Sequence, residues 1–67
     1  MNTEVVFQVS PSRITYVARV LEGYEHLGVV TTIDPQIGIA RVRATEDTAG
    51  LVKKILKSLP IDVHILQ

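Results

Sequence analysis

The segment of residues 10–28 constrains the fold more than any other part of the sequence. Its apolar residues recur every three or four positions, which is the spacing of one helix face and predicts a single amphipathic helix. We expect Ser10 to cap this helix, Pro11 to occupy its first turn, and Gly28 to adopt a left-handed conformation just past its end. The face expected to pack on the core carries Ile14, Val17, Ala18 and Leu21.

The apolar surface of this helix is wider than the roughly 100° that one core contact needs. The residues that widen it are Tyr16, Val20, Tyr24 and Leu27. A chain of 67 residues without cysteine cannot be reinforced by disulfides or thiolate-bound zinc, and folding at this size buries only about 60% of the unfolded chain's surface. We therefore expect a homodimer or a higher homo-oligomer, with this flank as one candidate interface.

Segments with the alternation of β-strands lie on both sides of the helix. Residues 4–9 predict one strand, and residues 29–34 and 39–45 predict two more, joined by a turn at 35–38 in which Gly38 takes a positive φ. Alternation places Val5, Phe7 and Val9 on one face of the first strand. Counting outward from the turn pairs Ile33 with Ala40, Thr31 with Val42 and Val29 with Ala44.

A second helix is predicted to begin near Thr45 to Asp47, whose side chains can cap it, and to end before Pro60. Its inner face is expected to carry Leu51, Val52, Ile55, Leu56 and Leu59. Residues 61–67 alternate again and predict a last strand, with Ile61, Val63 and Ile65 inward. The order βαββαβ predicts one domain over residues 1–67, an α+β ferredoxin-like fold whose four-stranded antiparallel sheet has order 4132 and both helices on one face.

The other face of this sheet is expected to stay open. By the predicted register it presents Val6, Gln8, Val30, Thr32, Ile39, Arg41, Arg43, Asp62, His64 and Leu66. The apolar members Val6, Val30, Ile39 and Leu66 make this face the second candidate interface. Stacking aromatics of the kind that bind RNA are missing from it.

The charges of the chain balance, with seven basic and seven acidic residues. A general binder of nucleic acids or membrane surfaces needs an excess of positive charge, so we expect neither partner. His26 and His64 show no metal-ligand spacing, and we expect no metal or other cofactor. The apolar stretches are too short to span a membrane and the N-terminal residues do not resemble a secretion signal, which favours a cytoplasmic location.

Candidate ligand-binding residues lie in two places. Ser10, Ser12 and Arg13 stand at the start of the first helix, where N–H groups and a guanidinium can hold an anion, although Ser10 can equally be a plain cap. Arg41 and Arg43 can form a phosphate site or pair with Glu4, Asp34 or Asp62. We find no catalytic constellation in the sequence, which favours a protein that is not an enzyme.

Several of these residues also carry a resemblance. Tyr16, Leu21-Glu22, Tyr24-Glu25, Leu27, Thr32, Asp34-Pro35 and Gly38-Ile39 resemble a family of short bacterial proteins that is catalogued only as a domain of unknown function. The match covers about the first two-thirds of the chain and implies no catalytic residues.

The order of elements also looks like that of ACT domains, a resemblance that implies amino-acid binding at the loop between the first strand and the first helix and at dimer interfaces. The leading hypothesis is thus a non-enzymatic, ACT-like, homo-oligomeric module that binds a small anionic or amino-acid ligand or another protein. Acylphosphatases share the topology, so the alternative is a small phosphate-binding or acylphosphatase-like hydrolase that uses Arg13, Arg41 or Arg43.

Overall fold

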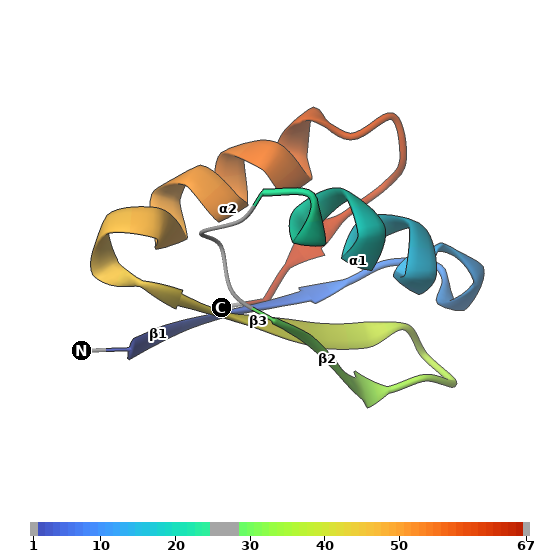
Figure 1. Cartoon of the computed structure of the whole chain (residues 1–67). Helices are drawn as coiled ribbons and strands as arrows, with labels where there is room; N and C mark the ends of the chain where they lie inside the picture. The colour runs from blue at the N-terminus through green and yellow to red at the C-terminus, as the bar shows by residue number, and fades with distance from the viewer. Residues whose placement is uncertain (1, 25–28, 67) are drawn as a thin grey trace.

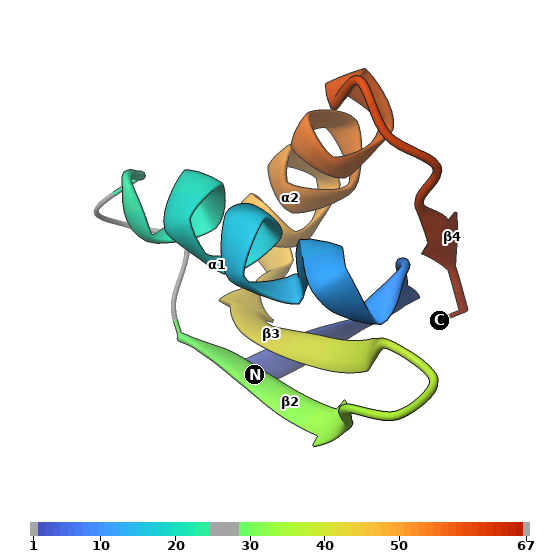
Figure 2. The same cartoon turned by 90° about the vertical axis from the view of Figure 1, so that its right-hand side faces the viewer.

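A computed structural model of the chain describes residues 2–24 and 29–66 (Figure 1). The elements follow the order β1 (Asn2–Gln8), a 3-10 turn η1 (Pro11–Arg13), α1 (Ile14–Glu22), β2 (Val30–Asp34), β3 (Ile39–Thr45), α2 (Glu46–Ser58) and β4 (His64–Ile65). The strands form one antiparallel sheet in the order β2-β3-β1-β4. Both helices cover the same face of this sheet (Figures 1 and 2), which confirms the predicted ferredoxin-like α+β fold and its strand order.

The core lies between this sheet and the two helices. Its buried residues are Val5, Phe7 and Val9 from β1 and the residue after it, Ala40, Val42 and Ala44 from β3, Val17 and Leu21 from α1, and Ala49, Val52, Ile55 and Leu56 from α2. The faces predicted for β1 and β3 are thereby confirmed. In α2 the prediction for Leu51 was wrong, because Ala49 takes the buried place one turn before Val52 and leaves Leu51 exposed.

The pairing of β2 with β3 differs from the predicted register. The observed pairs are Val30 with Val42, Thr31 with Arg41, Thr32 with Ala40 and Asp34 with Ile39. Ile33 is the extra residue of a β-bulge. Residues 30–32 are therefore shifted by one residue from the predicted pairing, and this shift turns each of their side chains to the opposite face of the sheet. Val30 therefore packs against the core instead of facing the open side. The predicted pairs of Ile33 with Ala40, Thr31 with Val42 and Val29 with Ala44 were wrong.

The first helix is shorter than predicted. It ends at Glu22, and the N–H of Gly23, which adopts a φ of -68°, still donates to Arg19 O. The Ser10 side chain makes no capping hydrogen bond; its carbonyl oxygen instead accepts from Arg13 N at 2.8 Å and closes the turn η1. Pro11 stands at the start of η1 as expected. The predictions for His26, Leu27 and Gly28 lie outside the described residues.

The second helix begins and ends as predicted. Thr45 is its cap, and the side chains and N–H groups of Thr45 and Thr48 satisfy one another in a capping box. Leu59, which directly follows the helix, precedes Pro60 and is extended. The last strand is shorter than the predicted residues 61–67, although Ile61, Val63 and Ile65 pack against the core as expected.

The turn between β2 and β3 ties this hairpin to the end of β1. Gly38 has a φ of 80°, which confirms its predicted left-handed conformation. Its N–H donates to Asp34 O at 2.9 Å, and its carbonyl oxygen accepts from Val9 N at 2.9 Å. A Cβ at this position would overlap the Val9 carbonyl group, so the close approach as well as the φ requires glycine.

Candidate functional site

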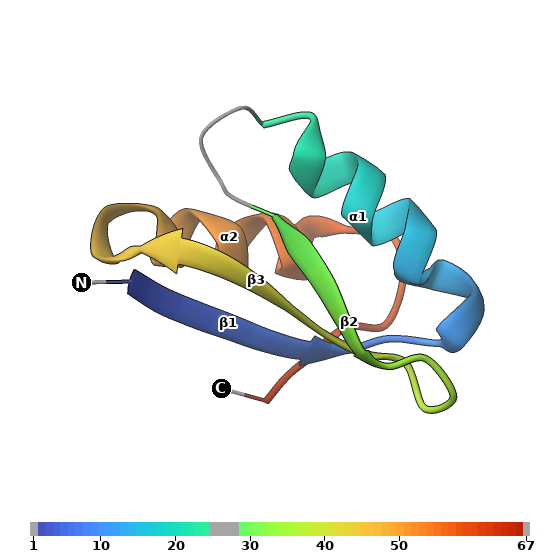
Figure 3. The same cartoon turned by 60° about the horizontal axis from the view of Figure 1, so that its bottom comes forward.

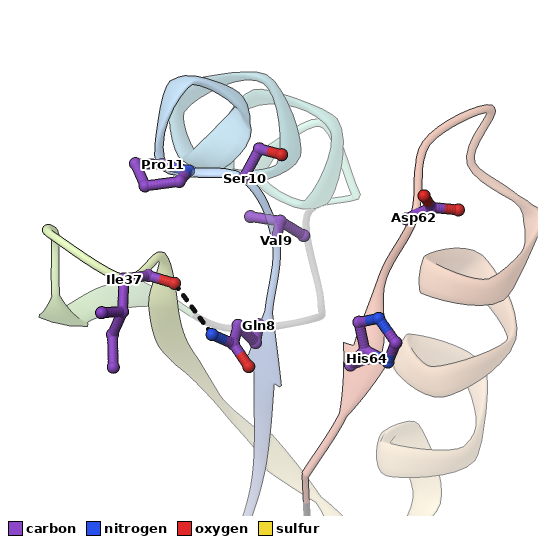
Figure 4. Close-up of a pocket in the computed structure, with 7 residues that line it drawn as sticks. All are labelled: Gln8, Val9, Ser10, Pro11, Ile37, Asp62 and His64. Carbon is purple, nitrogen blue, oxygen red and sulfur yellow. Dashed lines mark hydrogen bonds between the residues drawn. The ribbon is translucent and has the colours of Figure 1, made fainter.

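A cleft of about 400 Å³ opens at the end of β1, where the chain turns into η1 (Figure 4). Three segments that are far apart in the sequence meet there: the end of β1, the turn between β2 and β3, and the stretch leading into β4. The lining residues are Gln8, Val9, Ser10, Pro11, Ile37, Asp62 and His64.

Gln8 is the residue that links the walls of this cleft. Its Nε2 donates to Ile37 O at 3.0 Å, which leaves its Oε1 available as an acceptor. Its backbone lies opposite His64 in the pairing of β1 with β4. Asp62 lies two residues before β4 and His64 is the first residue of that strand. Both lie on the far side of β1 from Ile37 (Figure 4).

The polar side chains of the cleft can all accept hydrogen bonds. The Asp62 carboxylate and Gln8 Oε1 only accept, the Ser10 hydroxyl and the His64 imidazole can also donate, and neither lysine nor arginine is among the seven lining residues. Such a lining favours a ligand that donates hydrogen bonds or carries positive charge. The volume lies within the range of small-molecule sites, about 300–1,000 Å³.

The candidate ligand-binding residues of the sequence do not meet at one point. Ser10 lines the cleft, whereas Ser12 and Arg13 are exposed in η1 and do not line it. Arg41 and Arg43 lie on β3 and alternate with the buried Ala40, Val42 and Ala44, so they face the side of the sheet without helices. Arg41 Nη1 donates to Glu4 Oε2 at 3.4 Å, which is one of the pairings that the sequence left open.

The candidate interface residues divide between three environments. Tyr16, Tyr24 and Leu66 are exposed, Val6 and Ile39 are half-buried on the open face, and Val20 and Val30 are half-buried against the core. The open face therefore presents Thr31 from β2 where Val30 and Thr32 were expected.

The sequence did not predict a common site for Gln8, Ile37, Asp62 and His64. A signal was present, because alternation placed Gln8, Asp62 and His64 on one face, and strand order 4132 makes their strands neighbours. The sequence did not indicate where the turn that carries Ile37 lies. In the structure this turn is joined to the end of β1 by the hydrogen bond from Val9 N to Gly38 O.

Within residues 2–24 and 29–66, no cluster of three histidine or acidic side chains is placed to hold a metal ion. None of the helices described there has both the length and the apolar character needed to cross a membrane.

The described residues form a small ferredoxin-like α+β fold with a polar cleft at the end of its first strand. The chain belongs to the family described as a domain of unknown function, DUF4911, which matches residues 7–63. This confirms the resemblance seen in the sequence and extends it beyond the first two-thirds of the chain. No curated protein and no solved structure matches the chain.

Proposed function

We propose that the protein is a non-enzymatic, ACT-like module that binds a small molecule with an amino group in the cleft at the end of β1. The observation that carries this proposal is the convergence of Gln8, Ser10 and Asp62 around a cleft whose lining residues include neither lysine nor arginine. The cleft lies at the junction of the first strand with the first helical turn, where the resemblance to ACT domains implies amino-acid binding.

The chemistry of the cleft narrows the class of ligand. A protonated amine can donate to the Asp62 carboxylate in a charge-assisted hydrogen bond, which is about twice as strong as a neutral one. Gln8 Oε1 and the Ser10 hydroxyl can accept its remaining hydrogens. We therefore favour an amine or an amino acid over a simple anion as the ligand.

Two enzymatic alternatives receive less support. A phosphate-binding hydrolase needs basic groups at one point, yet Arg13, Arg41 and Arg43 are absent from the cleft and Arg41 is paired with Glu4. Ser10, His64 and Asp62 are the residue types of a hydrolytic triad, and such a triad needs hydrogen bonds from serine to histidine and from histidine to aspartate. Neither bond is present between these three described side chains.

The test is a thermal-shift screen of the protein against amino acids and primary amines, followed by titration calorimetry of each ligand that binds. At a hundredfold excess over its dissociation constant, a true ligand should stabilise the protein by about 2.7 kcal/mol. Asp62→Asn should weaken binding about tenfold, or about 1.4 kcal/mol. Asp47→Asn, which alters an exposed carboxylate in the first turn of α2, is the matched control and should leave affinity unchanged.

A screen without a ligand, or affinity that is indifferent to Asp62→Asn, would contradict the proposal. Hydrolysis of an activated ester that is lost in Ser10→Ala would instead favour the triad.

A further inference from the structure

The strand β2 is an outer strand of the sheet (Figure 3). It carries neither lysine nor proline against pairing with another strand, and the β-bulge at Ile33 interrupts it only near its end. Residues 29–33 are all β-branched and include neither a charged residue nor proline; Asp34 is the first charge. Natural proteins usually blunt such edges with lysine, proline, a very short strand or a covering loop. Val29 and Ile33 are 69% and 51% exposed, so apolar surface accompanies the open edge.

The direction of the backbone groups along this edge follows from the ladder. Arg43 N donates to Val29 O at 3.4 Å, and Thr31 lies opposite Arg41 two residues further along. In an antiparallel ladder, alternate residues point their N–H and C=O groups to the same neighbour. The N–H and C=O groups of Val29 and Thr31 are therefore directed to β3. Those of Val30 and Thr32 point outward from the open edge, in the plane of the sheet.

The same alternation holds at the opposite edge and supports this assignment. Leu66 N donates to Val6 O at 2.7 Å, and Gln8 pairs with His64. Val6 and Gln8 therefore direct their N–H and C=O groups to β4, whereas Val5 and Phe7 direct theirs to β3. The ladder is thus consistent across all four strands.

We propose that β2 pairs with β2 of a second copy of this chain, antiparallel and across a two-fold axis that passes at Thr31. In this register Val30 lies opposite Thr32 of the second copy. The outward N–H and C=O groups of Val30 then form hydrogen bonds with the outward C=O and N–H groups of Thr32 in the second copy. The two sheets join into one continuous sheet. This interface uses the edge of the sheet opposite β4, and residues 29–33 do not line the ligand cleft, although Ile37 in the turn after β2 does. The interface does not depend on the proposed function.

The second copy fits this edge better than an unrelated strand for three reasons. A two-fold axis makes the edge self-complementary, since each strand offers the same groups that it needs. No like charges meet between positions 29 and 33, because none are present there. The register also brings exposed Val29 beside Ile33 of the second copy, which removes two apolar side chains from water.

The helical layer agrees with this arrangement. α1 contacts β2, so the two copies of α1 become neighbours when the sheets join (Figure 2). A protein of 67 residues without disulfides gains stability from such association.

The experiment is sedimentation equilibrium of the full chain over a dilution series, with the dimer dissociation constant as readout. We expect a dimer for the wild type and an increase of at least tenfold in that constant for Val29→Lys and for Ile33→Lys. Leu51→Lys is the matched control, since Leu51 is 46% exposed on α2, far from the edge, and this variant should dimerise like the wild type. Circular dichroism of each variant shows that it is folded.

A dissociation constant above about 1 mM corresponds to a very weak association. A wild type that stays monomeric at a protein concentration of about 1 mM would therefore overturn the proposal. So would a dimer that both edge variants leave intact and that Ile39→Lys on the open face dissociates. Ligand stabilisation should persist in monomeric Ile33→Lys, so that failure of the interface and failure of the ligand site give different results.

Discussion

The two outer strands of the sheet differ in length, sequence and surroundings (Figure 2). β4 has only two residues, and the polar side chains of Asp62 and His64 accompany it at the cleft. β2 has five residues, all uncharged before Asp34, and two exposed apolar side chains stand at its ends. A short, polar edge resists pairing with another strand, whereas a longer, uncharged one invites it.

This difference suggests a division of roles within a very small domain. The β4 edge supplies polar groups that can hold a small ligand, and the β2 edge supplies backbone groups that can extend the sheet. Because β3 and β1 separate the two edges, substitutions at one should leave the other intact. The predictions below test this independence.

The largest effect is expected at Gly38, which supports both edges. Gly38→Ala places a Cβ against the Val9 carbonyl group in a residue with a φ of 80°, so it should destabilise the fold by about 3 kcal/mol or more. Urea denaturation measures the loss, and both ligand binding and dimerisation should weaken with it. A stability equal to that of the wild type would show that the turn is not held against β1.

The next largest effect separates the two sides of β2. Thr31→Pro removes an N–H that the ladder directs to β3 and leaves an acceptor on that strand unpaired, so it should cost about 2 kcal/mol of unfolding free energy. Thr32→Pro removes an outward N–H, so it should cost much less and should instead abolish the dimer. Denaturation and sedimentation of both variants provide the comparison. Equal destabilisation by the two prolines would contradict the assigned directions.

A smaller effect is expected at the other edge. Asp62→Lys replaces the one carboxylate among the seven described lining residues with an ammonium, so the affinity for an amine ligand should fall at least tenfold, or about 1.4 kcal/mol. Calorimetry measures the affinity and sedimentation the mass. The dimer should be unchanged, and a dimer lost in this variant would show that the two edges are coupled.

The smallest effect serves as a reference for both edges. Gly50 lies exposed in the interior of α2, where an added Cβ would meet no atom within 4 Å. Gly50→Ala should therefore stabilise the protein by about 0.5–1 kcal/mol through helix propensity alone. Thermal denaturation measures the gain. A change in ligand affinity or mass would indicate that α2 influences an edge.

Much of the fold could be predicted because local signals agreed with each other. Alternation in residues 4–9, the cap at Thr45, the stop before Pro60 and the glycine at position 38 each specify an element or a turn. Once the order βαββαβ is known, few topologies remain, and the strand order follows.

The register of β2 could not be predicted because its sequence does not distinguish its two faces. Residues 29–33 are β-branched throughout, so neither register is penalised by pattern alone. The bulge at Ile33 directly precedes the turn in which Gly38 O accepts from Val9 N, a tertiary contact that the pattern of this segment does not indicate. Which backbone N–H and C=O groups of β2 point outward follows only from the observed register of β2 against β3.

Neither the end of α1 nor the cleft was predicted correctly, and the reasons differ. The apolar period continues past Glu22, but Gly23 is a poor helix former and the helix ends before it. The cleft joins residues 8–11 to residues 37 and 62–64, and periodicity within one segment carries no information about such a meeting.

Amide hydrogen exchange measured by NMR at high and low protein concentration tests the division of roles most directly. The account predicts that the amides of Val30 and Thr32 exchange slowly in the concentrated sample and become fast on dilution. The amide of Leu66, which donates to Val6 O within the chain, should exchange at the same rate in both samples. Equal exchange rates for Val30 and Thr32 at all concentrations would contradict the claim that β2 is the pairing edge.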